Sequence, residues 1–100
     1  MNYFCLTNDP DHGVTDDYKE IFEDLSKESL FITTAVFCCL KNDNTALSAH
    51  CNTNETSSLE DKKYKNLMLK IKDEGHEIAF HGYSQSHDTR DEFNKGIDIY

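Results

Sequence analysis

Basic residues are scarce in this sequence. Lys and Arg together number 10 against 19 Asp and Glu, and the formal net charge is −9 with histidine neutral. A protein that binds nucleic acid needs a concentrated basic surface to release counterions from phosphates. Anionic membrane surfaces attract basic segments for a similar electrostatic reason. The charge balance therefore argues against both kinds of partner.

Long hydrophobic segments and a secretion signal are also lacking. The longest apolar run lies near residues 35–40, far short of the roughly 20 residues that cross a bilayer. The N-terminus has no basic region and reaches Asp9 too early for a signal peptide. We therefore expect a cytoplasmic protein without membrane insertion, in which the four cysteines are reduced thiols. No C-x-x-C pair supports a zinc-ribbon or thioredoxin interpretation.

The sequence does contain enough apolar residues, 37%, for one packed core. Strand-forming segments alternate with amphipathic ones, and the order βαβαβα predicts an α/β fold with a parallel sheet. The middle strand-forming segment is apolar on both faces, which suits the centre of such a sheet. The predicted strands cover residues 3–7, 30–40 and 77–81, and the predicted helices begin at residues 15–17, 59 and 89.

Each predicted helix has an apolar stripe at helical spacing and a start signal. The start signals are Thr15, a capping box at residues 57–60 and another at residues 89–92, and Gly75 fits the position after the second helix. The stripes are Tyr18, Ile21, Phe22 and Leu25 in the first helix, Tyr64, Leu67, Met68 and Ile71 in the second, and Phe93, Ile97 and Tyr100 in the third.

A three-stranded parallel sheet leaves two edges open, and parallel sheets are rarely that small. We therefore expect residues 1–100 to be a single, incomplete domain, the N-terminal part of a larger one. The alternative is a complete small α/β protein that forms an edge-to-edge homodimer. The polar segment over residues 41–58 is long for a loop, and we expect it to be functional or mobile.

Acids and histidines follow the first and third predicted strands. Asp9 and Asp11 end the first strand, and His81 ends the third with His87 close behind. The carboxyl ends of parallel strands meet at one edge, where ligands bind in α/β folds. Aspartate with two histidines is a ligand set for zinc or a similar divalent ion that leaves a position open for water. The second carboxylate can then accept a proton from that water.

Each of these residues also has an ordinary structural explanation. The Asp9–Asp11 turn can simply start a helix, His81 can be a core imidazole, and His87 can be solvated. His12 and His50 lie in polar segments, where we expect surface positions. His76 follows the glycine after the second helix, where a cation suits the helix dipole, and we expect a structural role. Only the joint placement of Asp9, Asp11 and His81 favours function.

At these residues the sequence resembles the polysaccharide deacetylase family, also called the NodB homology domain or carbohydrate esterase family 4. The first family motif is a strand ending in Thr-Phe-Asp-Asp-Gly or Asp-x-Asp, and residues 6–13 read LTNDPDHG. The second motif reads Gly-His-Glu-Ile-Gly-x-His-Thr-Tyr-Ser, and residues 75–84 read GHEIAFHGYS. Residues 34–38 loosely match a family strand, and the resemblance spans roughly residues 3–87.

The resemblance implies a distorted (β/α)7 barrel about twice this length. It implies Asp9 as the catalytic base, Asp11 and His81 as metal ligands, and Tyr83 as a substrate-binding residue. The expected ion is zinc, with cobalt, nickel, iron or manganese as alternatives. The family places its second histidine four residues after the first, where Gln85 stands, so that His87 is the candidate ligand. If His87 does not reach the ion, the site has lost a ligand or uses Gln85.

The implied activity is a metal-dependent hydrolase that removes an acetyl or formyl group from the nitrogen of an amino sugar in a polysaccharide or glycolipid precursor. The family's later motifs, including its general acid, are not found, and we expect little turnover from these 100 residues alone. A second hypothesis is a non-catalytic carbohydrate- or metal-binding module that retains the fold. A third is a receiver-like signalling domain, which expects an acid and not a histidine after the third strand.

Overall fold

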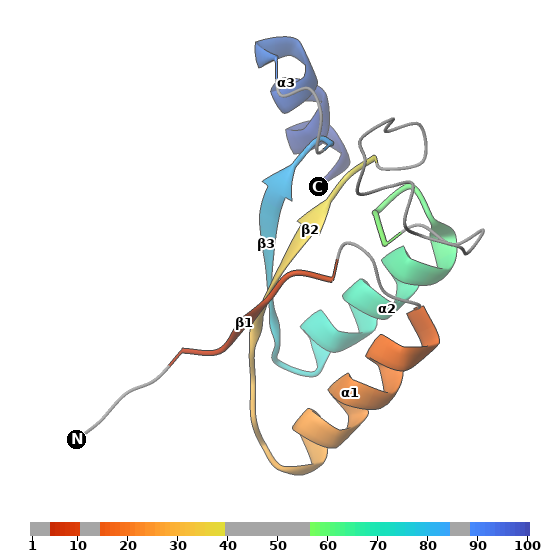
Figure 1. Cartoon of the computed structure of the whole chain (residues 1–100), viewed down its shortest axis with the longest axis vertical. Helices are drawn as coiled ribbons and strands as arrows, with labels where there is room; N and C mark the ends of the chain where they lie inside the picture. The colour runs from red at the N-terminus through yellow and green to blue at the C-terminus, as the bar shows by residue number, and fades with distance from the viewer. Residues whose placement is uncertain (1–4, 11–14, 40–56, 85–88) are drawn as a thin grey trace.

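A computed structural model describes residues 5–10, 15–39, 57–84 and 89–100 of the chain. Three parallel strands form one sheet in the order β1-β2-β3 and alternate with three helices (Figure 1). The predicted α/β class and the central position of the apolar strand are confirmed. The elements are β1 (Thr7–Asn8), α1 (Thr15–Lys27), β2 (Thr33–Phe37), α2 (Lys62–Asp73), β3 (Glu77–Gly82) and α3 (Arg90–Ile99).

The hydrophobic core lies between the sheet and the first two helices. Figure 1 shows α1 and α2 side by side on one side of the sheet. Val36 in β2 and Cys38, just after β2, point into this core, and both are fully buried. The alternate residues Thr33, Ala35 and Ala79 point to the other face and are only half-buried. The remaining members of the core are Phe22, Ile32, Leu59, Tyr64, Leu67, Met68 and Ile71.

Helix α2 starts later than the sequence predicts. Its N-cap is Asp61, whose carboxylate accepts hydrogen bonds from the backbone N–H groups of Lys63 and Tyr64 at 2.9 and 3.1 Å. The predicted capping box at residues 57–60 is therefore wrong. Its serines are buried, and Ser58 forms an isolated bridge with Phe37, the last residue of β2. A turn follows at residues 59–60, so the helix begins only after this segment.

The end of α2 is as predicted. Gly75 has φ = 107°, a left-handed conformation that favours glycine. Its N–H donates to the carbonyl of Lys72, and the N–H of His76 donates to the carbonyl of Ile71 at 3.0 Å. These two bonds form a Schellman motif, which satisfies carbonyls at the helix end and directs the chain into β3.

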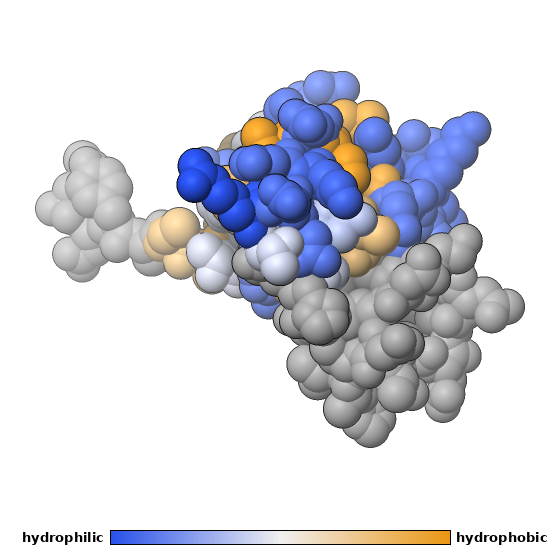
Figure 2. All heavy atoms as spheres, turned by 90° about the horizontal axis from the view of Figure 1, so that it is seen from above, coloured by the Kyte–Doolittle hydropathy of each residue, from blue (hydrophilic) through white to orange (hydrophobic). Residues whose placement is uncertain are grey.

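Two of the three predicted apolar stripes are only partly buried. All four stripe residues of α2 are buried, but Ile21 of α1 is 49% exposed. Helix α3 begins at the predicted capping box of Thr89 and Glu92. It contacts the sheet through Gly96, and its stripe residues Phe93, Ile97 and Tyr100 remain about half exposed. Hydrophobic residues accordingly show among hydrophilic ones when the molecule is seen from above (Figure 2).

Two of the three strands are shorter than the segments that predict them. Strand β1 begins at Thr7, after the half-exposed Leu6, and β2 begins at Thr33, after the exposed Phe31. Strand β3 matches its prediction to within one residue. Within the described ranges, no helix is long and apolar enough to cross a membrane.

Candidate functional site

The structure brings together Asp9 and His81, which the sequence places more than seventy residues apart. Asp9 follows β1 and His81 lies near the end of β3, so the two side chains meet at the carboxyl edge of the sheet. The Oδ1 atom of Asp9 lies 3.2 Å from Nδ1 of His81. The Asp9 side chain is 51% exposed and that of His81 is 33% exposed, so the pair is accessible from outside.

An irregularity in β3 aims His81 toward Asp9. Val36 pairs with Phe80, but the next residue of β2, Phe37, pairs with Gly82. His81 is therefore an extra residue in β3, which is the arrangement of a β-bulge. Such bulges twist a strand locally and redirect side chains. The redirection matters here because β2 lies between β1 and β3, and the imidazole must reach over β2 to contact Asp9.

The ring of Phe37 lies beneath this crossing. The ring centroids of Phe37 and His81 are 4.1 Å apart, and the rings are nearly parallel with an interplanar angle of 19°. Phe37 is only 5% exposed and lies outside the core cluster that Val36 and Cys38 join. Each of the three strands thus contributes to one cluster, which we call the Asp9–His81–Phe37 cluster.

Two of the predicted ligands, Asp11 and His87, lie outside the described residues. Asp9 and His81 are the predicted site residues that the structure brings together. Over the described ranges, no group of three or more His, Cys, Asp and Glu side chains is arranged to hold a metal ion. Gln85, the alternative to His87, also lies outside those ranges.

Tyr83 belongs to a second polar group that the sequence analysis missed. The Cys39 thiol donates to Oε2 of Glu60 at 3.1 Å, and the Cys39 backbone N–H donates to the Tyr83 carbonyl at 2.8 Å. A side-chain hydrogen bond with Cys39 raises the pKa of Tyr83 above its ordinary value. Cys39 and Tyr83 each lie two residues after a member of the Asp9–His81–Phe37 cluster. The sequence carries no periodic signal for this group, because Cys39 and Tyr83 follow the ends of β2 and β3 and Tyr83 packs against the core cluster.

His76 is a structural residue, as predicted, but for a different reason. Its imidazole is buried between Phe22 and Phe31, with ring centroids 5.3 and 5.5 Å away. Nδ1 accepts a hydrogen bond from the backbone N–H of Ile32, so Nδ1 carries no proton and Nε2 must. Nε2 lies 3.0 Å from Oγ of Ser26 and donates to it. His76 therefore cannot take a proton from Ser26, and the pair is not a catalytic dyad.

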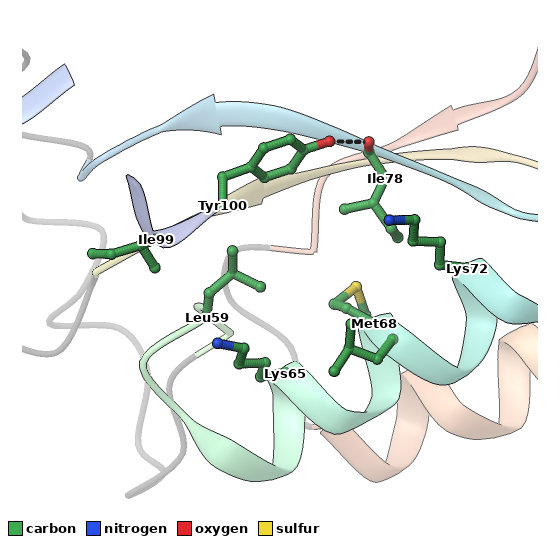
Figure 3. A pocket seen from close by; sticks show the side chains of 8 residues that line it. Leu59, Lys65, Met68, Lys72, Ile78, Ile99 and Tyr100 are labelled. Carbon is green, nitrogen blue, oxygen red and sulfur yellow. Dashed lines mark hydrogen bonds between the residues drawn. The ribbon is translucent and has the colours of Figure 1, made fainter. Parts of the chain in front are cut away.

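An apolar cavity of about 100 Å³ lies among α2, β3 and the end of α3 (Figure 3). Its wall includes Met68 and Ile78, and the Tyr100 hydroxyl closes one side by donating to the Ile78 carbonyl. None of the residues of the Asp9–His81–Phe37 cluster lines it. The cavity is a separate feature on the helix-covered side of the sheet.

No protein-family model matches this chain, and no curated protein or solved structure matches it either. The site is therefore defined by its residues: a carboxylate–imidazole pair, supported by an aromatic ring, at the carboxyl edge of a parallel sheet.

Proposed function

We propose that this chain is part of a metal-dependent hydrolase that removes an acetyl or formyl group from the nitrogen of an amino sugar. The observation that carries the proposal is the 3.2 Å contact between Asp9 and His81. Carboxylate oxygen and imidazole nitrogen are donors that zinc accepts. Two ligand atoms on one tetrahedral zinc stand about 3.3 Å apart at usual bond lengths, so the residues fit such an ion.

The same contact fits a second arrangement. If Nδ1 of His81 donates to Asp9, Nε2 carries the lone pair that binds the ion. Histidine ligands commonly donate their other ring nitrogen to a carboxylate in this way. In this second arrangement Asp9 is the base, and His81, Asp11 and His87 form a three-residue ligand set that leaves one position for water.

We assign Asp9 as the base of the reaction. A divalent ion held here would supply a water with a lowered pKa and a positive charge for the developing oxyanion. Asp9 is half exposed, so its carboxylate can receive the proton of that water. Its contact with His81 keeps the carboxylate directed toward the site. The family resemblance supports a role in sugar binding for Tyr83, which follows the end of β3 and packs against the core cluster.

The negative charge of the chain suits the proposed substrate. A formal charge of −9 repels a phosphate-rich polymer but not a neutral N-acylated glycan. The substrate class is therefore a neutral amino-sugar glycan or precursor.

We further propose that the sheet is the N-terminal portion of a distorted (β/α)7 barrel. Neighbouring strands in the chain are neighbours in the sheet, and α1 and α2 lie on one side of it. A barrel has this arrangement, with helices outside and the other sheet face inside. The first half of a doubly wound sheet shares it, whereas a receiver-like sheet places its first strand between the second and third. The observed order differs from the receiver order.

A metal titration tests the proposal. Calorimetry with Zn²⁺ on the wild-type chain should show one site, and His81→Ala and Asp11→Ala should each abolish or strongly weaken it. His50→Ala is the matched control, because it removes a histidine that has no assigned role. Equal binding by wild type, His81→Ala and Asp11→Ala would exclude this ligand set.

A second candidate, a non-catalytic carbohydrate- or metal-binding module, is favoured by Gln85 at the position of the usual second histidine. Acetate release from an N-acetylglucosamine oligomer separates the two candidates. The hydrolase requires release by the intact protein, of which these residues are the proposed N-terminal part, and Asp9→Asn should remove that release. A non-catalytic module would bind the oligomer or the metal, and neither the wild type nor Asp9→Asn would release acetate.

A further inference from the structure

The exposure of the Asp9–His81 pair raises the question of what keeps its geometry. Ion pairs between exposed side chains contribute little and hold their partners loosely. Asp9 is half exposed, and His81 is one-third exposed. A rotation of the imidazole about its side-chain bonds would turn Nδ1 away from the carboxylate. A contact with a buried, fixed group restricts such a rotation.

Phe37 supplies such a contact. It lies on β2, the middle strand, and its side chain is 5% exposed. Its ring stacks on the imidazole at 4.1 Å and 19°, so the imidazole plane is set by the plane of the phenyl ring. Stacked rings attract each other beyond their buried area. The β-bulge places the His81 backbone, and the stack sets the ring plane in which Nδ1 meets Asp9.

We infer that Phe37 is a positioning residue, whose ring holds the His81 imidazole with Nδ1 toward Asp9. One consequence of this positioning, that Nε2 faces a metal ion, rests on the proposed function. Its structural part, the preference for the tautomer with a proton on Nδ1, concerns the metal-free protein. The two parts can therefore be measured separately.

The test compares three variants with wild type in the absence of metal. Phe37→Leu removes the ring and keeps an apolar side chain, and Phe37→Tyr keeps the stacked ring. Val36→Ala is the matched control, because Val36 is the neighbouring buried residue of β2 but points into the core on the other face. Long-range ¹H–¹⁵N spectra of the neutral side chain report which nitrogen of His81 carries the proton.

We expect wild type, Phe37→Tyr and Val36→Ala to show mainly the tautomer protonated on Nδ1. Phe37→Leu should show a mixture, and its Zn²⁺ affinity should fall about 2- to 10-fold, as expected for the loss of one aromatic contact. Two results overturn the inference: a wild-type spectrum for His81 in Phe37→Leu, or an equal change in Val36→Ala. If wild type binds no Zn²⁺, the proposed metal site fails, while the spectra still decide the role of Phe37.

Discussion

Replacing Gly96 by alanine should not stabilise α3, although alanine is the better helix former. In an unhindered helix the exchange gains about 1 kcal/mol. Here an added Cβ would lie 2.8 Å from Cζ and 2.9 Å from Cε2 of the Phe80 ring. Ordinary contacts of this kind are 3.4–4 Å. The ring must move, and overpacking of this sort costs about 1–3 kcal/mol.

The net expectation for Gly96→Ala is a loss of about 0–2 kcal/mol in the free energy of unfolding. The ring has little freedom to yield, because it also contacts Phe93 and Tyr100, with centroids 5.4 and 5.8 Å away. The Gly96 carbonyl accepts a hydrogen bond from the Cys38 thiol at 3.3 Å, which a shift of α3 would lengthen.

Urea unfolding followed by circular dichroism measures the effect, and a double-mutant cycle isolates its cause. Phe80→Leu makes room at the contact. In that background Gly96→Ala should raise the free energy of unfolding by up to about 1 kcal/mol, the gain from the better helix propensity of alanine. Asn94→Ala, at an exposed position of the same helix, is the control for propensity alone. The reasoning is refuted if Gly96→Ala alone is about 1 kcal/mol more stable than wild type.

Two further predictions concern α2 and the core. Asp61→Ala should lower the free energy of unfolding by about 0.5–2 kcal/mol because two backbone N–H groups lose their acceptor, and Asp61→Asn should be nearly neutral; equal stability of wild type and Asp61→Ala in urea would contradict the cap. Burial raises the pKa of the Cys38 thiol to about 11 from 9.0. The folded protein then keeps a proton that the unfolded chain releases, so stability should fall by about 1–3 kcal/mol between pH 9 and pH 11. Cys38→Ala should lack this part of the pH dependence, and identical slopes in the two proteins would contradict the assignment.

Local signals in the sequence predicted the elements where no distant contact competes. The α2 stripe, the Gly75 terminus and the Thr89 cap depend on residues within one or two helical turns, and all three are confirmed. The cap at residues 57–60 was wrong because of a distant contact. The N–H groups of Leu59 and Glu60 donate to the carbonyls of Phe37 and Cys38, which extends the sheet pairing into this segment.

The sequence likewise predicted one part of the candidate site and not another. The meeting of Asp9 and His81 could be predicted, since the carboxyl ends of parallel strands converge. The β-bulge could not, because it depends on the register between β2 and β3, and the residues from Glu77 to Gly82 do not mark which of them is extra. The stack of His81 on Phe37 follows from that register, so the sequence could not predict the stack either.

The exposed apolar residues bear on how the sheet is completed. An edge-to-edge homodimer would cover β1 or β3 but leave the stripe of α3 in solvent, with Phe93 47% and Ile97 49% exposed. It would also leave the open sheet face with its half-buried Ala35 and Ala79. Further βα units would cover both, because each barrel helix packs beside its neighbours and the barrel interior encloses the second face. The positions of these residues agree better with the proposed barrel than with the dimer. Light scattering that shows a dimer with α3 protected from hydrogen exchange would reverse that preference.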